Sequence, residues 1–196
     1  MERFNDRGIL VLARGKAVAA AFKKMLESSH YRPALTAGSA AEGRRVLASG
    51  RARLVLVYTP LADEFGVETA AEFARRPDVG VLLMVPSEIY DQARHKAAPS
   101  GVLVMTRQAD RTQLLQAVDM LASTQGKVSQ LMKENERLRR RLEDESTVNR
   151  AKCLLIEDGM TENEAHRWIE KQAMDQGLPR REIAEDVIDR HEEQGK

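Results

Sequence analysis

The residues best suited to chemistry in this sequence are basic side chains around its single tryptophan. Arg167, Trp168 and Lys171 fall within about one helical turn, so their side chains share one helical face and its edge. Guanidinium and ammonium groups neutralise phosphates, and an exposed indole can stack on a base. Because proteins usually recognise RNA through unpaired, splayed bases, this group predicts contact with an RNA loop.

Four further basic residues extend the predicted contact: Arg150, Lys152, Arg180 and Arg181. The charge balance opposes it, because residues 150–196 carry eight Lys and Arg against twelve Asp and Glu. A net acidic module binds phosphate only if its cations gather on one side. Trp168 also has two interpretations, since a tryptophan can contact RNA or anchor the core of a small helical bundle.

Three short amphipathic helices are expected to position these side chains. The first ends at Gly159, a residue type that tolerates the backbone geometry after a helix. The second begins with Thr161 and Glu164, a capping-box pattern. Pro179 stands at the first turn of the third. Apolar positions expected at helical spacing are Ala151, Leu154 and Leu155 in the first helix, Ala165, Trp168 or Ile169, Ala173 and Met174 in the second, and Ile183, Ala184, Val187 and Ile188 in the third.

This three-helix module resembles the ANTAR domain, the RNA-binding unit of AmiR/NasT-type antitermination regulators. The matching positions are Ala151, Leu155, Gly159, Glu164, Ala165, Ala173, Met174, Ile183 and Ala184. The resemblance implies an RNA-binding three-helix domain over residues 150–196. All these positions are packing positions, so an unrelated small helical bundle is the alternative.

Residues 1–121 alternate short apolar runs with amphipathic stretches. Strands are expected at residues 9–13, 31–37, 54–58, 79–85 and 102–105, and helices at 17–26, 40–48, 68–75, 88–97 and from about 110. Continuously apolar runs are typical of strands covered on both faces. Five strand–helix units on this spacing predict an α/β fold, a doubly wound, five-stranded parallel sheet of the flavodoxin-like type.

The size and order of these units resemble the receiver domain of response regulators. In that family an acidic pair follows the first strand, a phosphorylated Asp ends the third and a Lys follows the fifth. Here the corresponding residues are Ala13 and Arg14, Tyr58, and Arg107. Phosphorylation needs carboxylates to hold a divalent cation and one carboxylate as nucleophile. We therefore predict a pseudo-receiver that is not phosphorylated by the usual route; Asp63 and Glu64 follow in the next loop, out of register with the strand end.

Residues 122–149 carry the seven-residue repeat of a two-stranded coiled coil. The repeat continues from the preceding helix: one core position is filled by Leu114, Leu121, Val128, Asn135 and Leu142, and the other by Leu131 and Leu138. An Asn in such a core fixes register and favours a parallel dimer, while Glu134 and Arg139 can pair between helices. Thr124 and Gly126 weaken the repeat and predict a hinge. The alternative is one long helix packing back on its own receiver.

The spacing of residues and the motifs present argue against enzymes and metal-binding proteins. The four histidines have no ligand spacing with one another or with Cys153, the only cysteine, which we expect to be a small buried hydrophobe. The sequence has no phosphate-binding loop, dinucleotide motif or nucleophile elbow. It therefore predicts no enzyme, no cofactor and no metal. Without an apolar run of membrane length or a signal-peptide pattern, it predicts a cytoplasmic protein that makes no membrane contact.

The order of receiver, coiled coil and three-helix module resembles the whole layout of AmiR/NasT-type regulators. The resemblance implies transcription antitermination by a homodimer that binds hairpin loops of a nascent leader RNA. Without a phosphoryl switch, control must come from a ligand-sensing or signalling protein partner. Two alternatives stay open: a DNA-binding regulator, because the basic run Arg137–Arg141 precedes a helical domain, and a scaffold that sequesters a partner, because the terminal module is acidic.

Overall fold

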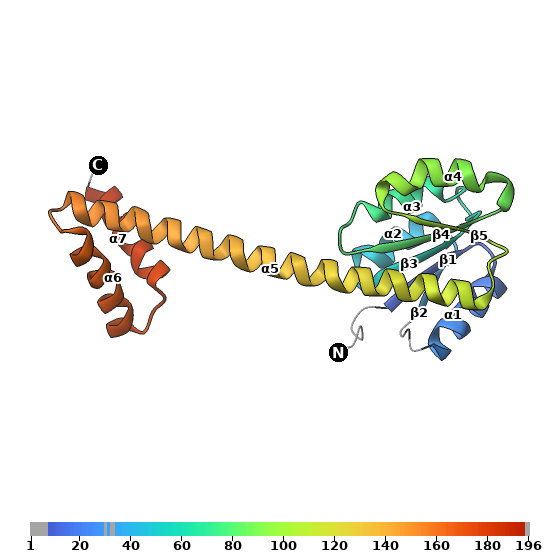
Figure 1. The fold of residues 1–196 in the computed structure, drawn as a ribbon, viewed down its shortest axis with the longest axis horizontal. Helices are drawn as coiled ribbons and strands as arrows, with labels where there is room; N and C mark the ends of the chain where they lie inside the picture. The colour runs from blue at the N-terminus through green and yellow to red at the C-terminus, as the bar shows by residue number, and fades with distance from the viewer. Residues whose placement is uncertain (1–7, 30, 32–33, 195–196) are drawn as a thin grey trace. The chain divides into compact units, whose positions relative to one another are not determined.

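The apolar runs of the N-terminal part form a five-stranded parallel sheet with the strand order β2-β1-β3-β4-β5 (Figure 1). The strands are β1 (Gly8–Ala13), β2 (Ala34–Ala37), β3 (Ala52–Tyr58), β4 (Gly80–Val85) and β5 (Leu103–Thr106). The computed structural model describes residues 8–29, 31 and 34–194, so part of the strand predicted over residues 31–37 lies outside the described residues. The predicted doubly wound parallel sheet is confirmed.

Helices cover both faces of this sheet, as Figure 1 shows. On one face lie α2 (Ala40–Ala48), α3 (Val67–Ala74) and α4 (Tyr90–Ala97), with the short helices η1 (Ser87–Ile89) and η2 (Ala98–Ser100). On the other lie α1 (Lys16–Ser28) and the first part of α5 (Arg111–Glu157). Strands β1, β3 and β4 are fully apolar in their centres because both of their faces are buried.

The predicted hinge near Thr124 and Gly126 is wrong, because α5 continues through both residues. The Thr124 hydroxyl donates to the Met120 carbonyl within the helix. Near Gly126, α5 contacts the sheet, because Arg53 Nη1 donates a hydrogen bond to Ser129 Oγ at 3.2 Å. The helix continues although a Gly within a helix costs about 1 kcal/mol relative to Ala.

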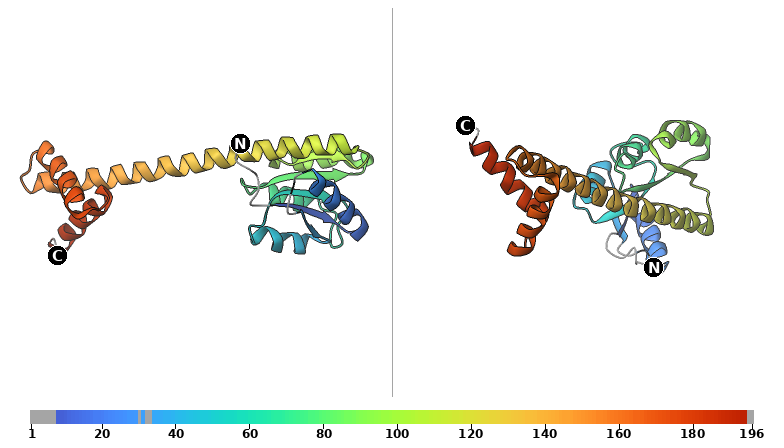
Figure 2. Two further views of the ribbon diagram at one scale, coloured as in Figure 1. Left: turned by 90° about the horizontal axis from the view of Figure 1, so that it is seen from below. Right: turned by 60° about the vertical axis from the view of Figure 1, so that its left-hand side comes forward.

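The first of the three predicted short helices is the end of α5 and not a separate element. Residues 150–157 belong to a helix that begins at Arg111. The chain then divides into two compact units, residues 1–130 and 131–196, and the second contains the end of α5 with α6 (Glu162–Gln176) and α7 (Arg180–Gln194). Figure 2 shows these three helices from two further directions.

The second unit has a core of its own. Eight buried residues form it: Ala151, Leu155, Ala165, Ile169, Ile183, Ala184, Val187 and Ile188. The predicted capping box is present, since Thr161 Oγ1 accepts from the Glu164 backbone N–H and the Glu164 carboxylate accepts from the Thr161 backbone N–H. Gly159 and Gly177 follow α5 and α6 with φ of +102° and +67°, which a residue with a side chain rarely adopts.

Two apolar residues of this unit are not where the sequence pattern put them. Cys153 is exposed, although we expected a buried residue. Met174 is 83% exposed, although it was counted among the apolar positions of its helix. Both sit on helices whose buried faces are filled by other residues. Within the described residues, no helix has the length and apolar character needed to cross a membrane.

Candidate nucleic-acid interface and the receiver edge

The residues predicted as a degenerate phosphorylation site meet at the carboxyl edge of the sheet. Ala13 ends β1 and is in register with Tyr58, which ends β3. Arg107 follows β5, and its backbone N–H donates to the Val85 carbonyl at 2.8 Å. Arg14 follows Ala13 and is exposed. The topology therefore brings these positions to one edge of the sheet.

Tyr58 and Arg107 interact directly at this edge. The Arg107 guanidinium carbon lies 5.4 Å from the centre of the Tyr58 ring, a cation–π distance. Arg107 Nη1 also donates to the Thr59 carbonyl at 3.2 Å. On the side of α1, the ring of Phe22 packs against the ring of Tyr58, with 5.6 Å between the ring centres. An aromatic ring and a cation thus lie together at the end of β3.

The nearest carboxylates in the chain have other partners. Asp63 accepts from the backbone N–H groups of Ala40 and Ala41 at 2.8 and 3.1 Å, at the start of α2. These bonds hold the pKa of Asp63 below its ordinary value. Glu64 accepts from the Thr69 hydroxyl. Asp63 therefore caps the start of α2.

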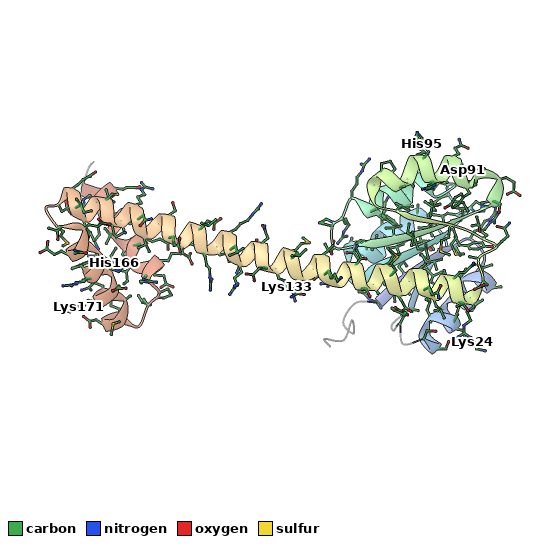
Figure 3. The ribbon with its side chains drawn as sticks, in the orientation of Figure 1. Lys24, Asp91, His95, Lys133, His166 and Lys171 are labelled. Carbon is green, nitrogen blue, oxygen red and sulfur yellow. The ribbon has the colours of Figure 1, made fainter. Side chains whose placement is uncertain are left out.

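Helix α6 positions the three residues first predicted to contact RNA. Its buried face consists of Ala165 and Ile169, and Arg167 and Lys171 lie away from it and are exposed. Figure 3 labels Lys171 on this helix. Trp168 is half-buried and packs against the core at the border between the two faces. Its ring therefore takes part in the core while keeping an exposed portion.

The other basic residues of the predicted patch lie on different helices, and three of them are paired with acids. Arg150 on α5 is 3.0 Å from Glu192, and Arg180 is 3.4 Å from Glu170. Arg181 binds Glu185 at 2.7 Å and Asp144 at 2.8 Å, and these carboxylates raise the pKa of its guanidinium above the ordinary value. Lys152 is half-buried on α5.

These ion pairs separate two roles within the predicted patch. Arg181 joins the beginning of α7 to α5 through Asp144, which is a structural task. Among the described residues, Arg167 and Lys171 have no ion-pair partner. Lys152 on α5 also has no ion-pair partner among the described residues but is half-buried, so the exposed, unpaired cations of the predicted patch are the two on α6.

The structure adds Met174 to this face. It follows Lys171 by about one turn and Arg167 by about two, so the three form one stripe. Helical phase alone could have placed it there, because Met174 follows the buried Ala165 by about two and a half turns and so points away from the core. Counting apolar residues without fixing the phase missed this.

The coiled-coil positions fall into two groups. Leu121 packs against the receiver core and Val128 is half-buried. Leu131, Leu138 and Leu142 are 69%, 47% and 66% exposed. At about 100° per residue these three leucines lie within a narrow strip of α5, roughly opposite the side on which Ala151 packs against α6 and α7. The free seam of α5 therefore consists of Leu131, Asn135, Leu138 and Leu142.

Both parts of the chain are similar to known proteins. Residues 136–188 match the ANTAR domain family. The transcriptional regulatory protein PdtaR of Mycobacterium tuberculosis is 23% identical over 184 residues, which cover 93% of this chain and 90% of that protein. Residues 136–188 are therefore similar to ANTAR domains.

Solved structures match the N-terminal part. The signal receiver domain of an HD domain-containing protein from Pseudomonas fluorescens Pf-5 has a TM-score of 0.57 at 17% identity, covering 66% of this chain and 97% of that one. A CheY-like receiver domain from Methanospirillum hungatei JF-1 has a TM-score of 0.54 at 20% identity, covering 62% and 97%. The N-terminal sheet and its helices have the receiver fold.

Proposed function

We propose that this chain, an ANTAR regulator with a receiver domain, binds hairpin loops of nascent leader RNA as a homodimer and acts by transcription antitermination. The observation that carries the proposal is the outward face of α6. There Arg167 and Lys171 are exposed, and they flank an indole that is half-exposed at the edge of the core. Cations that neutralise phosphates beside an aromatic ring that stacks on a base are a common arrangement for recognising looped RNA.

The acids of the module are most numerous on α7, although α6 also carries four, Glu162, Glu164, Glu170 and Asp175, beside its two cations. Six of the twelve Asp and Glu of residues 150–196 lie on α7: Glu182, Glu185, Asp186, Asp189, Glu192 and Glu193. The outward face of α6 keeps its two unpaired cations. Those acids are also the best support for the alternative of a scaffold that takes a partner without nucleic acid.

The alternative of a DNA-binding regulator rests on the basic run 137–141 of α5. Two of its arginines are engaged within the helix, because Arg137 binds Glu134 at 2.8 Å and Arg140 binds Glu136 at 3.0 Å. Both pairs are exposed and therefore weak. The run supplies charge without an aromatic ring for base stacking, which favours the α6 face as the nucleic-acid contact.

The proposed dimer uses the free seam of α5. A parallel pair would bury Leu131, Leu138 and Leu142 against their counterparts and pair Asn135 across the axis. Glu134 of one helix would face Arg139 of the other, which favours the parallel arrangement. Because the seam faces away from the side of α5 that carries α6 and α7, dimerisation would leave the outward face of α6 open.

The receiver of the proposed regulator takes its input from a protein partner. A partner or ligand shifts an equilibrium only by its differential affinity for two states, so a ligand-sensing or signalling protein must bind one state of the dimer preferentially.

We expect acetyl phosphate with Mg²⁺ to leave the protein unmodified, because Tyr58 stands at the acceptor position and Asp63 caps α2. Intact-mass spectrometry tests this; a phosphoryl adduct mapping to residues 52–64 would contradict it.

Direct binding measurements test the proposed function. The full-length protein should bind a tandem-hairpin RNA from the leader of its neighbouring operon more tightly than a duplex DNA or an unstructured RNA. Lys171→Ala should weaken that binding. It should also reduce the slope of the logarithm of the binding constant against the logarithm of salt concentration by about one, as expected for the loss of one phosphate contact. Lys133→Ala, which removes an exposed cation from α5 (Figure 3), is the matched control and should bind as the parent does.

Each competing function has its own outcome in this experiment. Tighter binding to the duplex would favour a DNA-binding regulator, and no binding to any nucleic acid would favour a scaffold. Equal losses for Lys133→Ala and Lys171→Ala would mean that charge alone, and not the α6 face, determines binding.

A further inference from the structure

Met174 is an exposed apolar residue on α6. At 83% it is the most exposed of the large apolar side chains in the described part of the chain. It lies on a well-formed helix whose core face is already filled by Ala165 and Ile169. Helix formation therefore does not need an apolar side chain at this position, where a polar residue of similar helix propensity would serve equally well.

The surroundings of Met174 indicate what it contacts. Arg167 and Lys171 lie along the same stripe, and both are exposed without an ion-pair partner among the described residues. Of the acids beside them, Glu170 lies 3.4 Å from both Arg180 and His166, and Asp175, next to Met174 and one turn after Lys171, is exposed. A protein partner would usually require a broader apolar ridge along α6. One apolar side chain beside two free cations is instead complementary to a ligand with alternating anionic and apolar groups.

We propose that Met174 forms the apolar contact with an unpaired base of the RNA loop, while Lys171 and Arg167 hold phosphates next to that base. The inference rests on the proposed RNA-binding function. It adds that Met174 contacts a base of the RNA and not its sugar–phosphate backbone. A thioether is soft and unbranched, so it adapts to the face or edge of an aromatic ring. In a single-stranded loop the base is free to turn out and meet it.

Substitution of the side chain tests the assignment. Met174→Gln keeps length and helix propensity but replaces the apolar end with an amide, and we expect it to weaken binding to the loop RNA about three- to tenfold. The salt dependence should stay unchanged because no phosphate contact is lost. Met174→Leu should bind within about twofold of the parent. Met120→Gln, at another exposed methionine on α5, is the matched control and should bind as the parent does.

RNAs with single abasic positions in the loop then identify the partner. At the contacted position, loss of the base should weaken binding of the parent and remove the difference between the parent and Met174→Gln. At other loop positions the difference should persist. A difference that persists at every abasic position would overturn the base contact.

Two outcomes separate the inference from the function on which it rests. If the parent binds the loop RNA and Met174→Gln binds it equally well, the inference is wrong while RNA binding stands. If the parent binds no RNA, both are wrong. Circular dichroism of each variant must match the parent, and Met174→Leu provides a folded comparison at the same position.

Discussion

Aspartate at both Leu131 and Leu138 is expected to make the protein monomeric and to weaken its binding to a tandem-hairpin RNA by about 10²- to 10⁴-fold. Within one chain these leucines are 69% and 47% exposed, so the substitution removes little packing there. In a parallel dimer it would place four carboxylates in the core of the seam. With the dimer lost, each hairpin is bound by one module alone, and the gain from linked binding disappears.

A double variant at matched positions controls for the added charge. Ser123→Asp with Gln130→Asp adds the same charge at the same seven-residue spacing, at exposed positions of α5 outside the seam. It should remain a dimer by light scattering and bind the two-hairpin RNA as the parent does. Binding to an RNA with a single hairpin should be nearly equal for all three proteins. A monomeric parent at micromolar concentration, or an undiminished affinity in a monomeric Leu131/Leu138 variant, would contradict the proposal.

Much of the receiver could be predicted because its strands are buried on both faces. A run such as Leu54–Tyr58 has to be continuously apolar when helices cover both sides, and that pattern is local in the sequence. The register of β1 with β3 then brought Ala13 and Tyr58 together without further information. The packing of Arg107 on the Tyr58 ring could not be predicted, because it depends on side-chain directions after two different strands.

The continuity of α5 was not evident from local preferences. Thr124 and Gly126 both disfavour a helix by amounts of about 1 kcal/mol or less. The neighbours of this part of α5 come from residues distant in sequence: Arg53 binds Ser129, and Gly80 leaves room for Gln125, whose Cγ would be only 2.9 Å from a Cβ at position 80. Local propensity is overridden wherever a helix rests on a sheet in this way.

The candidate interface was predicted in part for the same physical reason. Arg167, Trp168 and Lys171 share a face of one helix, which spacing alone establishes. The pairing of Arg150 with Glu192 and of Arg181 with Asp144 joins residues far apart in the chain, so the sequence could not show that these cations are engaged. The exposure of Met174 could have been predicted, because it needs only the phase of α6 relative to Ala165.

Ile169→Ala is expected to unfold the second unit while leaving the receiver folded. Ile169 is 1% exposed and is one of only five core residues of that unit larger than alanine, with Leu155, Ile183, Val187 and Ile188. Truncating a buried Ile to Ala costs about 2–5 kcal/mol. A core this small supplies only a few kcal/mol in total, so the loss is comparable with the whole stability of the module.

The single tryptophan makes this unfolding measurable without interference from the receiver. Trp168 packs against the core of the second unit, and the chain has no other tryptophan, so indole fluorescence reports on that unit alone. Met174→Ala is the matched control, since it also removes an apolar side chain from α6 but one that is 83% exposed. Its urea midpoint should stay close to that of the parent, within about 0.5 kcal/mol in stability. If the two variants shifted the fluorescence transition equally, Met174 would belong to the core, and the outward stripe of α6 would lose its apolar member.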